Sequence, residues 1–97
     1  MMTNYEVMFI VKANMEEDQI KKEAESVKKL INGKGSKVIE FKEMGRKKLA
    51  YPINKETSGY YYVMTVETDN ANIAEFDRKV RINENILRHL IIKLESE

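Results

Sequence analysis

The order of hydrophobic periodicities along the chain limits its possible folds more than any other feature of the sequence. Four segments rich in β-branched and aromatic side chains predict strands, at residues 4–11, 36–53, 60–67 and 86–94. Residues 14–33 and 72–81 instead repeat apolar side chains every three or four positions, which is typical of helices with one buried face. The predicted order of elements is therefore β-α-β-β-α-β.

Each predicted helix has one apolar stripe and a signal for its first turn. The stripe of the first helix consists of Ile20, Ala24, Val27 and Ile31, widened by Leu30. The stripe of the second consists of Ile73, Phe76 and Val80. Capping boxes, in which side chains satisfy the free N–H groups of a first turn, are predicted at Asn14 with Glu17 and at Asn72 with Glu75. Residues 69–72 offer several caps for the second helix. Glycines at 33 and 35 are expected to end the first helix.

The predicted strands differ in their place in the sheet. The first and last are apolar on both sides, so we expect both to lie in its interior. The second is interrupted at residues 45–48 and contains Pro52, which cannot donate a ladder hydrogen bond and so indicates an edge. A turn at residues 55–59 leads into the third strand.

Two helices with one apolar stripe each can cover only one face of a four-stranded sheet. The sequence therefore predicts an α+β fold of the ferredoxin-like, split β-α-β type, with a four-stranded antiparallel sheet and both helices on one face. With 97 residues, the chain is long enough for one modest core, and we expect a single domain over residues 1–97.

The composition excludes several classes of protein. The absence of cysteine removes disulfides, thiolate zinc sites and cysteine nucleophiles, and it suits a reducing, cytoplasmic compartment. The early apolar run Val7–Val11 has five residues and follows Glu6, so neither a signal peptide nor a membrane span is expected.

The sheet face that the helices leave open is predicted to carry apolar side chains. If Val7 and Phe9 point toward the helices, Met8 and Ile10 point away from them. On the third strand the same alternation places Tyr61 and Val63 on the open face. An exposed apolar patch of this kind is typical of a partner-binding surface. We therefore predict that Met8, Ile10, Tyr61 and Val63 bind a partner.

The basic residues are unevenly distributed. The formal net charge is +1, which excludes a uniformly basic nucleic-acid-binding coat. However, residues 33–55 carry seven basic and two acidic side chains, and residues 78–93 carry five basic and one acidic. A near-neutral chain with two such segments can present a basic stripe to phosphates.

Catalytic patterns are lacking in the sequence. His89 is the single histidine, and its place in an apolar strand predicts a packed, hydrogen-bonded side chain rather than a general base. No Gly-rich phosphate loop, activated serine or acidic metal-ligand spacing occurs. We therefore expect no enzyme activity, no cofactor and no metal.

The segment Ser58–Thr65 partly matches the RNA-recognition-motif consensus on a third strand. Its phase is wrong for that role, because Tyr60 and Tyr62 would share the core face with Met64. We therefore interpret these tyrosines as part of the core and its rim.

The segment from Gly45 to Ile53 (GRKKLAYPI) resembles the signature of the bacterial small-subunit ribosomal protein S-six family. The likeness extends over residues 4–93, since the opening at Tyr5, the Gly59–Tyr61 segment and the closing segment from Arg81 to Arg88 are also similar to that family.

This resemblance implies a ferredoxin-like fold and a structural, non-catalytic role without a cofactor, on the ribosome in the cytoplasm. It implies binding to the central domain of small-subunit ribosomal RNA, jointly with small-subunit protein eighteen as a heterodimer. The positions that match the family's basic residues, and that we expect to bind RNA, are Arg46, Lys47, Lys48, Arg81 and Arg88.

Two questions stay open from the sequence. The partner could dock on the open sheet face or along a sheet edge. A different class of protein, a non-catalytic ferredoxin-like regulatory or ligand-binding domain that dimerises through its sheet, is the alternative function.

Overall fold

A computed structural model describes residues 3–31, 35–53 and 56–94. The elements are β1 (Thr3–Lys12), α1 (Glu17–Ile31), β2 (Lys37–Ile53), β3 (Glu56–Thr68), α2 (Asn70–Arg81) and β4 (Ile86–Lys93). Their order is the predicted β-α-β-β-α-β. The predicted end of the first helix at Gly33 lies outside the described residues.

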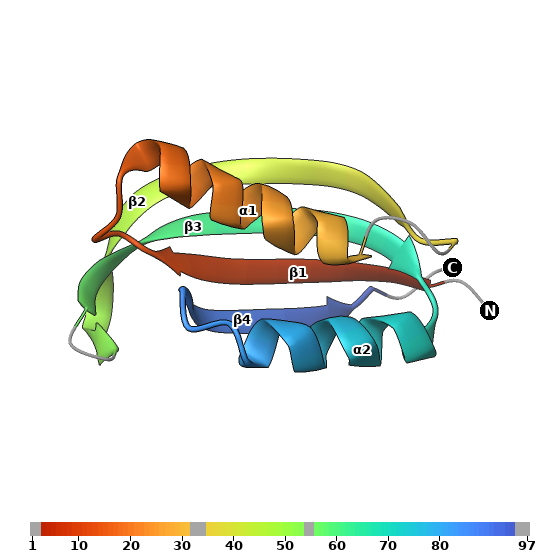
Figure 1. The fold of residues 1–97 in the computed structure, drawn as a ribbon. Coiled ribbons are helices and arrows are strands. Elements are labelled where there is room, and N and C mark those ends of the chain that lie inside the picture. Colours follow the sequence, from red (N-terminus) through yellow and green to blue (C-terminus); the bar gives the residue numbers. More distant parts are fainter. Residues whose placement is uncertain (1–2, 32–34, 54–55, 95–97) are drawn as a thin grey trace.

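The strands form one four-stranded sheet in the order β2-β3-β1-β4, and all neighbours are antiparallel. Both helices lie on the same face of the sheet, α1 across β1 and β3 and α2 along β4 (Figure 1). The predicted fold is therefore confirmed, with β1 in the interior and β2 at an edge. The prediction that the last strand is interior is wrong. The strand is apolar in both phases because Ile91 packs against the main core, whereas Leu90 (51% exposed) and Ile92 (45% exposed) lie on the open face. Neither phase requires a neighbouring strand on both sides.

The main core fills the space between the helices and the sheet. Phe9 and Tyr62, on neighbouring strands, stack with ring centroids 5.3 Å apart, and Phe41 of β2 tilts against both. The predicted helix stripes face this layer, where Ile20, Ala24, Val27, Ile31, Phe76 and Val80 are buried. Ile73 packs against the same cluster, whereas Leu30 is 38% exposed, so the prediction that it widens the stripe of α1 is wrong. Tyr60 packs against the same cluster, as the phase of β3 predicts.

The first helix begins with a cap other than the predicted one, whereas the second begins at one of the caps that residues 69–72 offer. The carbonyl of Glu16 accepts the N–H groups that open α1, because residues 13–16 carry the chain from the sheet to the helix layer. Asn14 instead donates to the Glu56 carboxylate at 3.3 Å. Asp69 caps α2 by accepting the N–H of Asn72 at 2.8 Å, so the helix starts at the first of the offered caps and not at the capping box of Asn72 with Glu75.

The strand β2 is continuous, so the predicted interruption at residues 45–48 is wrong. The register shifts between Glu43 and Gly45, and Gly45 adopts a φ of 90°, which glycine tolerates without strain. The predicted turn at 55–59 is also largely wrong, because β3 already begins at Glu56. Lys55 lies outside the described residues.

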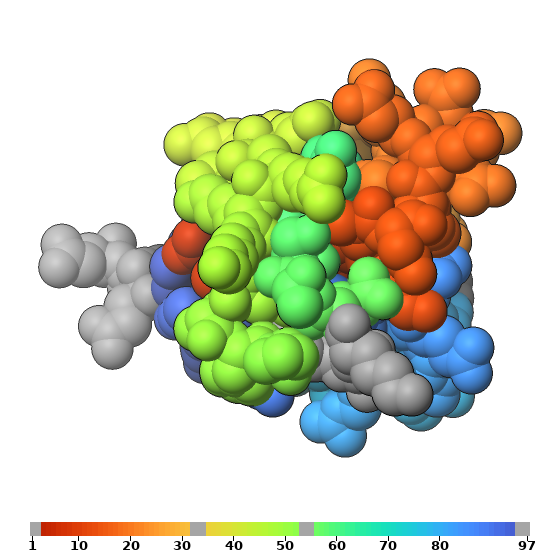
Figure 2. Space-filling model, turned by 90° about the vertical axis from the view of Figure 1, so that its left-hand side faces the viewer, coloured from red at the N-terminus to blue at the C-terminus, as the bar shows by residue number. Residues whose placement is uncertain are grey.

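The hairpin formed by β2 and β3 bends at its far end toward the open face (Figures 1 and 2). This bend creates a second apolar cluster of Ile10, Leu49 and Leu87, with Tyr61 packed against it. Gly59 permits the close approach of the strands, since a Cβ there would lie 2.4 Å from Cγ2 of Ile10. One end of the open face is therefore covered by the chain itself.

Candidate RNA and partner interface

The sheet register places the predicted partner residues together. Met8 lies between Val63 and Leu90, and Ile10 lies between Tyr61 and Arg88. Directly paired residues of antiparallel strands share a face. Since the odd-numbered residues of β1 are in the main core, all of these side chains belong to the open face.

The exposed apolar part of the open face differs slightly from the predicted set. Met8, Tyr61 and Val63 are half-buried, whereas Ile10 is 9% exposed because Leu49 and Leu87 cover it. Leu90 and Ile92 add apolar surface that the sequence did not assign, because the phase of the last strand was ambiguous. A shallow hollow of about 310 Å³ opens here, lined by Met8, Ile10, Tyr61, Arg88, His89 and Leu90.

Two of the predicted RNA-binding cations lie over aromatic rings beside this hollow. The Nζ atom of Lys47 is 5.7 Å from the ring centroid of Tyr61. The guanidinium carbon of Arg88 is 5.4 Å from the ring centroid of Tyr51, which is 55% exposed. Both distances are within the range of cation–π attraction. Sequence reasoning missed Tyr51, whose only signal was an aromatic residue in a strand predicted to be at an edge.

The remaining hairpin cations point to the other side. Arg46 pairs with Tyr60 and Lys48 pairs with Ser58, so both lie on the helix side of the hairpin. The guanidinium of Arg46 donates to the hydroxyl oxygen of Ser58, with N–O distances of 3.3 and 3.4 Å. The hairpin end therefore carries cations on both of its sides.

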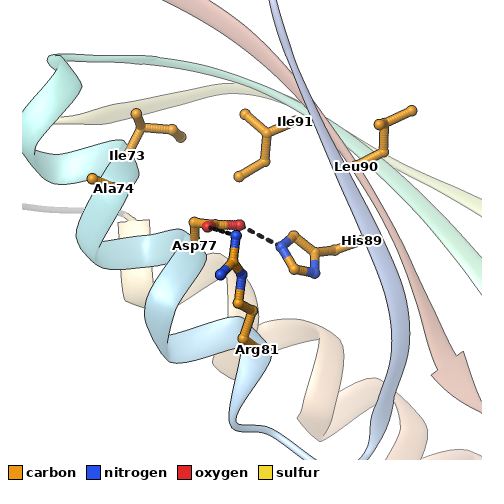
Figure 3. Close-up of a pocket in the computed structure, with 7 residues that line it drawn as sticks. All are labelled: Ile73, Ala74, Asp77, Arg81, His89, Leu90 and Ile91. Carbon is orange, nitrogen blue, oxygen red and sulfur yellow. Dashed lines mark hydrogen bonds and ion pairs between the residues drawn. The ribbon is translucent and has the colours of Figure 1, made fainter.

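Arg81 is the last residue of α2 and therefore lies in the helix layer, on the covered side of the sheet (Figure 1). Asp77 accepts from Arg81 at 3.0 Å and contacts Nε2 of His89 at 2.5 Å, so one carboxylate lies between the two side chains (Figure 3). The interpretation of His89 as a packed, hydrogen-bonded histidine is therefore confirmed.

The two halves of the open face differ in charge. Toward the hairpin, the register places Lys12, Lys47 and Arg88 on this face. Toward the start of β1, the same register places the carboxylates Glu6, Glu40 and Glu67 there, interspersed with Lys37 and Lys42. Lys42 forms an ion pair with Glu40 at 3.1 Å. The open face is therefore cationic at one end, apolar in the middle and of mixed charge at the other end.

The described residues give little support to a metal site, a catalytic tyrosine or a membrane-spanning helix. Within residues 3–31, 35–53 and 56–94, no three His, Asp or Glu side chains are grouped so that they could hold a metal ion. Burial, with smaller contributions from Glu43 and Tyr60, raises the pKa of Tyr62 to about 12, but this hydroxyl faces the helix side. No helix in the described part of the chain is both long enough and apolar enough to cross a membrane.

Comparisons with known proteins agree with this architecture. The family model described as Ribosomal protein S6 matches residues 4–93. The chain is 41% identical to small ribosomal subunit protein bS6 of Phytoplasma australiense over 92 residues, covering 95% of this chain and 99% of that protein. It is 40% identical to the protein of the same name from Halalkalibacterium halodurans over 95 residues, covering 98% and 100%.

Solved structures agree as well. The crystal structure of 30S ribosomal protein S6 from Thermotoga maritima superposes with a TM-score of 0.90 at 30% identity, covering 97% of this chain and 89% of that one. An uncharacterized protein from the same organism, 14% identical with a TM-score of 0.60, shares the fold alone.

The relatives are named as proteins of the small ribosomal subunit, which are structural components and not enzymes. The predictions of a non-catalytic protein and of a ribosomal, cytoplasmic location are thereby confirmed. The chain belongs to the ribosomal protein S6 family.

Proposed function

We propose that this chain is a structural component of the bacterial small ribosomal subunit that binds the central domain of small-subunit ribosomal RNA jointly with small-subunit protein eighteen. The observation that carries the proposal is the composition of the open face. Exposed apolar side chains in its middle adjoin cations at its hairpin end, so one surface suits a protein and a polyanion side by side.

A protein partner suits the middle of the open face. Met8, Val63 and Leu90 are neighbours across three strands, and an uncovered apolar area of this kind is typical of a binding surface. Glu6 lies on the same face, beside Ile92, where it would attract a basic partner. This arrangement favours docking on the sheet face over addition along an edge. Ile10 contributes less than its sequence position predicts, because the chain already covers it.

RNA suits the hairpin end. Arg46, Lys47 and Lys48 come from consecutive positions of an exposed edge strand, and Arg88 is held beside them by Tyr51. Arg81, the last residue of α2, lies in the helix layer and adds a cation on the covered side of the sheet. Because affinity for RNA comes largely from neutralised phosphates, a chain with a net charge of +1 gains from a partner that adds positive charge.

The experiment measures binding to a central-domain RNA fragment at several salt concentrations, by the chain alone and with the partner. We expect weak binding by the chain alone and tight binding by the pair. Replacing Arg46, Lys47 and Lys48 by alanine should weaken the pair and lower the magnitude of its salt slope by up to about 3. The matched control replaces three exposed lysines of α1, Lys21, Lys22 and Lys29, which should change neither quantity.

Partner docking is tested separately, without RNA. Leu90→Asp should lower the affinity for the partner, whereas Ile82→Asp should not, although Ile82 is even more exposed. Tight RNA binding by the chain alone would contradict the joint mode. Equal effects of the two aspartate variants would remove the open face from the partner site.

The alternative is a regulatory domain that dimerises through its sheet. Membership of the ribosomal protein S6 family argues against this alternative. Sedimentation of the protein with and without ribosomal subunits tests the alternative. A regulatory domain would sediment as a dimer and would not cosediment with the subunits.

A further inference from the structure

We infer that Tyr51, together with Arg88, forms a platform on which an unpaired RNA base stacks. The inference rests on the proposed function and names the form of RNA that the hairpin end accepts. Tyr51 belongs to neither set of residues that the sequence assigned to RNA or partner.

The first support is the exposure of the ring. The chain has eight aromatic residues, all within the described part, and Tyr51 is the only one that is exposed. At 55% exposure, more than half of the accessible surface of this residue is open to solvent. The neighbouring odd-numbered residue Leu49, by contrast, is 7% exposed in the second apolar cluster. The hairpin therefore packs one side chain inward and leaves the ring beside it uncovered.

The second support is the position of the Arg88 guanidinium against the Tyr51 ring. Its guanidinium carbon lies 5.4 Å from the ring centroid of Tyr51, so a planar cation and a planar ring are held next to each other from two different strands. A second pair of a cation and a ring lies on the same face, where the Nζ atom of Lys47 is 5.7 Å from the ring centroid of Tyr61. Alternating rings and cations are the usual means by which proteins hold unpaired nucleotides, through stacking on the rings and attraction of the phosphates.

The third support is the charge of the surroundings. In the hairpin half of the open face, the register places three cations and no carboxylate among the described residues. This charge favours a polyanion over an apolar protein segment. A base-paired RNA helix would present phosphates and riboses here, and it would leave the Tyr51 ring without a flat surface to cover. An unpaired nucleotide can stack its base on the Tyr51 ring while its phosphates contact the cations.

The test uses the complete chain in complex with small-subunit protein eighteen. Binding is measured to a central-domain fragment, to a duplex, and to a single strand of the same length. Tyr51→Phe keeps the ring and should bind all three as the unchanged protein does. Tyr51→Leu keeps apolar volume without the ring and should weaken binding to the fragment by about 5- to 150-fold, corresponding to the usual loss of one stacked base. The duplex should be bound equally by both variants.

The salt dependence separates stacking from charge. Because Tyr51 neutralises no phosphate, Tyr51→Leu should leave the salt slope unchanged, whereas Arg88→Gln should lower its magnitude by about 1. Urea unfolding of each variant detects any folding defect, and Ile82→Leu serves as a control substitution at another exposed site.

Three results would overturn the inference while leaving the proposed function intact. They are unchanged binding by Tyr51→Leu, an equal loss for duplex and fragment, or a loss of affinity for the protein partner measured without RNA. The last result would assign the ring to the protein interface. Failure of the unchanged pair to bind any RNA would instead overturn the proposed function, and the inference with it.

Discussion

The two faces of the sheet are built by the same strands but have different uses. On the covered face, Phe9, Tyr62 and Met64 are almost completely buried beneath the helices. On the open face, Met8 and Val63 alternate with them and are only half-buried. Both faces are apolar, so hydrophobicity alone does not separate the core from a binding surface. The difference arises because two helices can cover one face, which leaves the apolar side chains of the other available to partners.

The largest expected effect compares two neighbours on β1. Phe9→Ala removes a ring that is fully buried against Phe41 and Tyr62, and it should lower the free energy of unfolding by about 3–5 kcal/mol. Met8→Ala, one residue earlier, should cost less than about 1 kcal/mol, because its side chain is already partly in water. Urea unfolding of both variants measures the two losses.

In binding to the protein partner, the order of the two effects should be reversed, so that Met8→Ala causes the larger loss. Met8→Ala is expected to weaken the complex with the protein partner, since Met8 lines the hollow of the open face. Similar losses of stability for Phe9→Ala and Met8→Ala would mean that the open face is as well packed as the core, and the comparison would fail.

Periodicity was sufficient to predict the covered face. The stripes of both helices and the odd-numbered residues of β1 must meet whatever the order of the strands, and they do. The position of β4 at an edge was not predictable in this way, because it depends on pairing between distant segments. The bend of the hairpin was missed for a similar reason. It arises from register shifts in β2 and from the contact of Gly59 with Ile10.

The candidate site was predictable in its parts but not in its arrangement. Alternation along β1 and β3 correctly placed Met8, Tyr61 and Val63 on one face. The meeting of Arg88 with Tyr51 joins residues 37 positions apart, on strands at opposite edges of the sheet. No local pattern predicts such a contact, because it requires the hairpin to bend across β3 and β1.

The second expected effect is an alkaline loss of stability from the covered face. The pKa of Tyr62 is raised from 10.0 to about 12, mainly by burial. Between those pH values the unfolded chain gives up this proton and the folded chain keeps it. Unfolding is therefore favoured as pH rises, by about 2 kcal/mol at pH 12. Urea titrations from pH 8 to 12 measure this loss, which should be absent below about pH 9.

The control for this titration is Tyr62→Phe, which lacks the ionisable hydroxyl. The difference in stability between the unchanged protein and this variant should change with pH over the same interval. A constant difference would show that Tyr62 ionises equally in the folded and unfolded chain, and that the covered face is open to water at this point.

The third expected effect concerns the covered corner of the open face. Leu49→Ala should lower the free energy of unfolding by about 2 kcal/mol, because Leu49 is 7% exposed and packs on Ile10 and Leu87. The loss should be smaller than for Phe9→Ala, since the cluster has few members. Met44→Ala, at an exposed position of the same strand, should change stability by less than about 0.5 kcal/mol.

Leu49→Ala also releases the bent end of the hairpin. Hydrogen exchange of the backbone amides at residues 46–51 should therefore become faster in this variant, while exchange in α1 stays unchanged. A uniform increase over the whole molecule would show instead that the second cluster and the main core unfold together.

The smallest expected effect is a gain in stability on the covered face. Among the described residues, the hydroxyl oxygen of Tyr62 has no hydrogen-bond partner, although the side chain is 1% exposed. A buried polar atom without a partner is destabilising, and removing it leaves the ring and its stacking on Phe9 in place. Tyr62→Phe should therefore raise the free energy of unfolding at pH 7 by about 1 kcal/mol. A loss would indicate that an ordered water bonds the hydroxyl in the small hollow lined by Glu43 and Tyr60, so that even the best-packed layer of this sheet contains solvent.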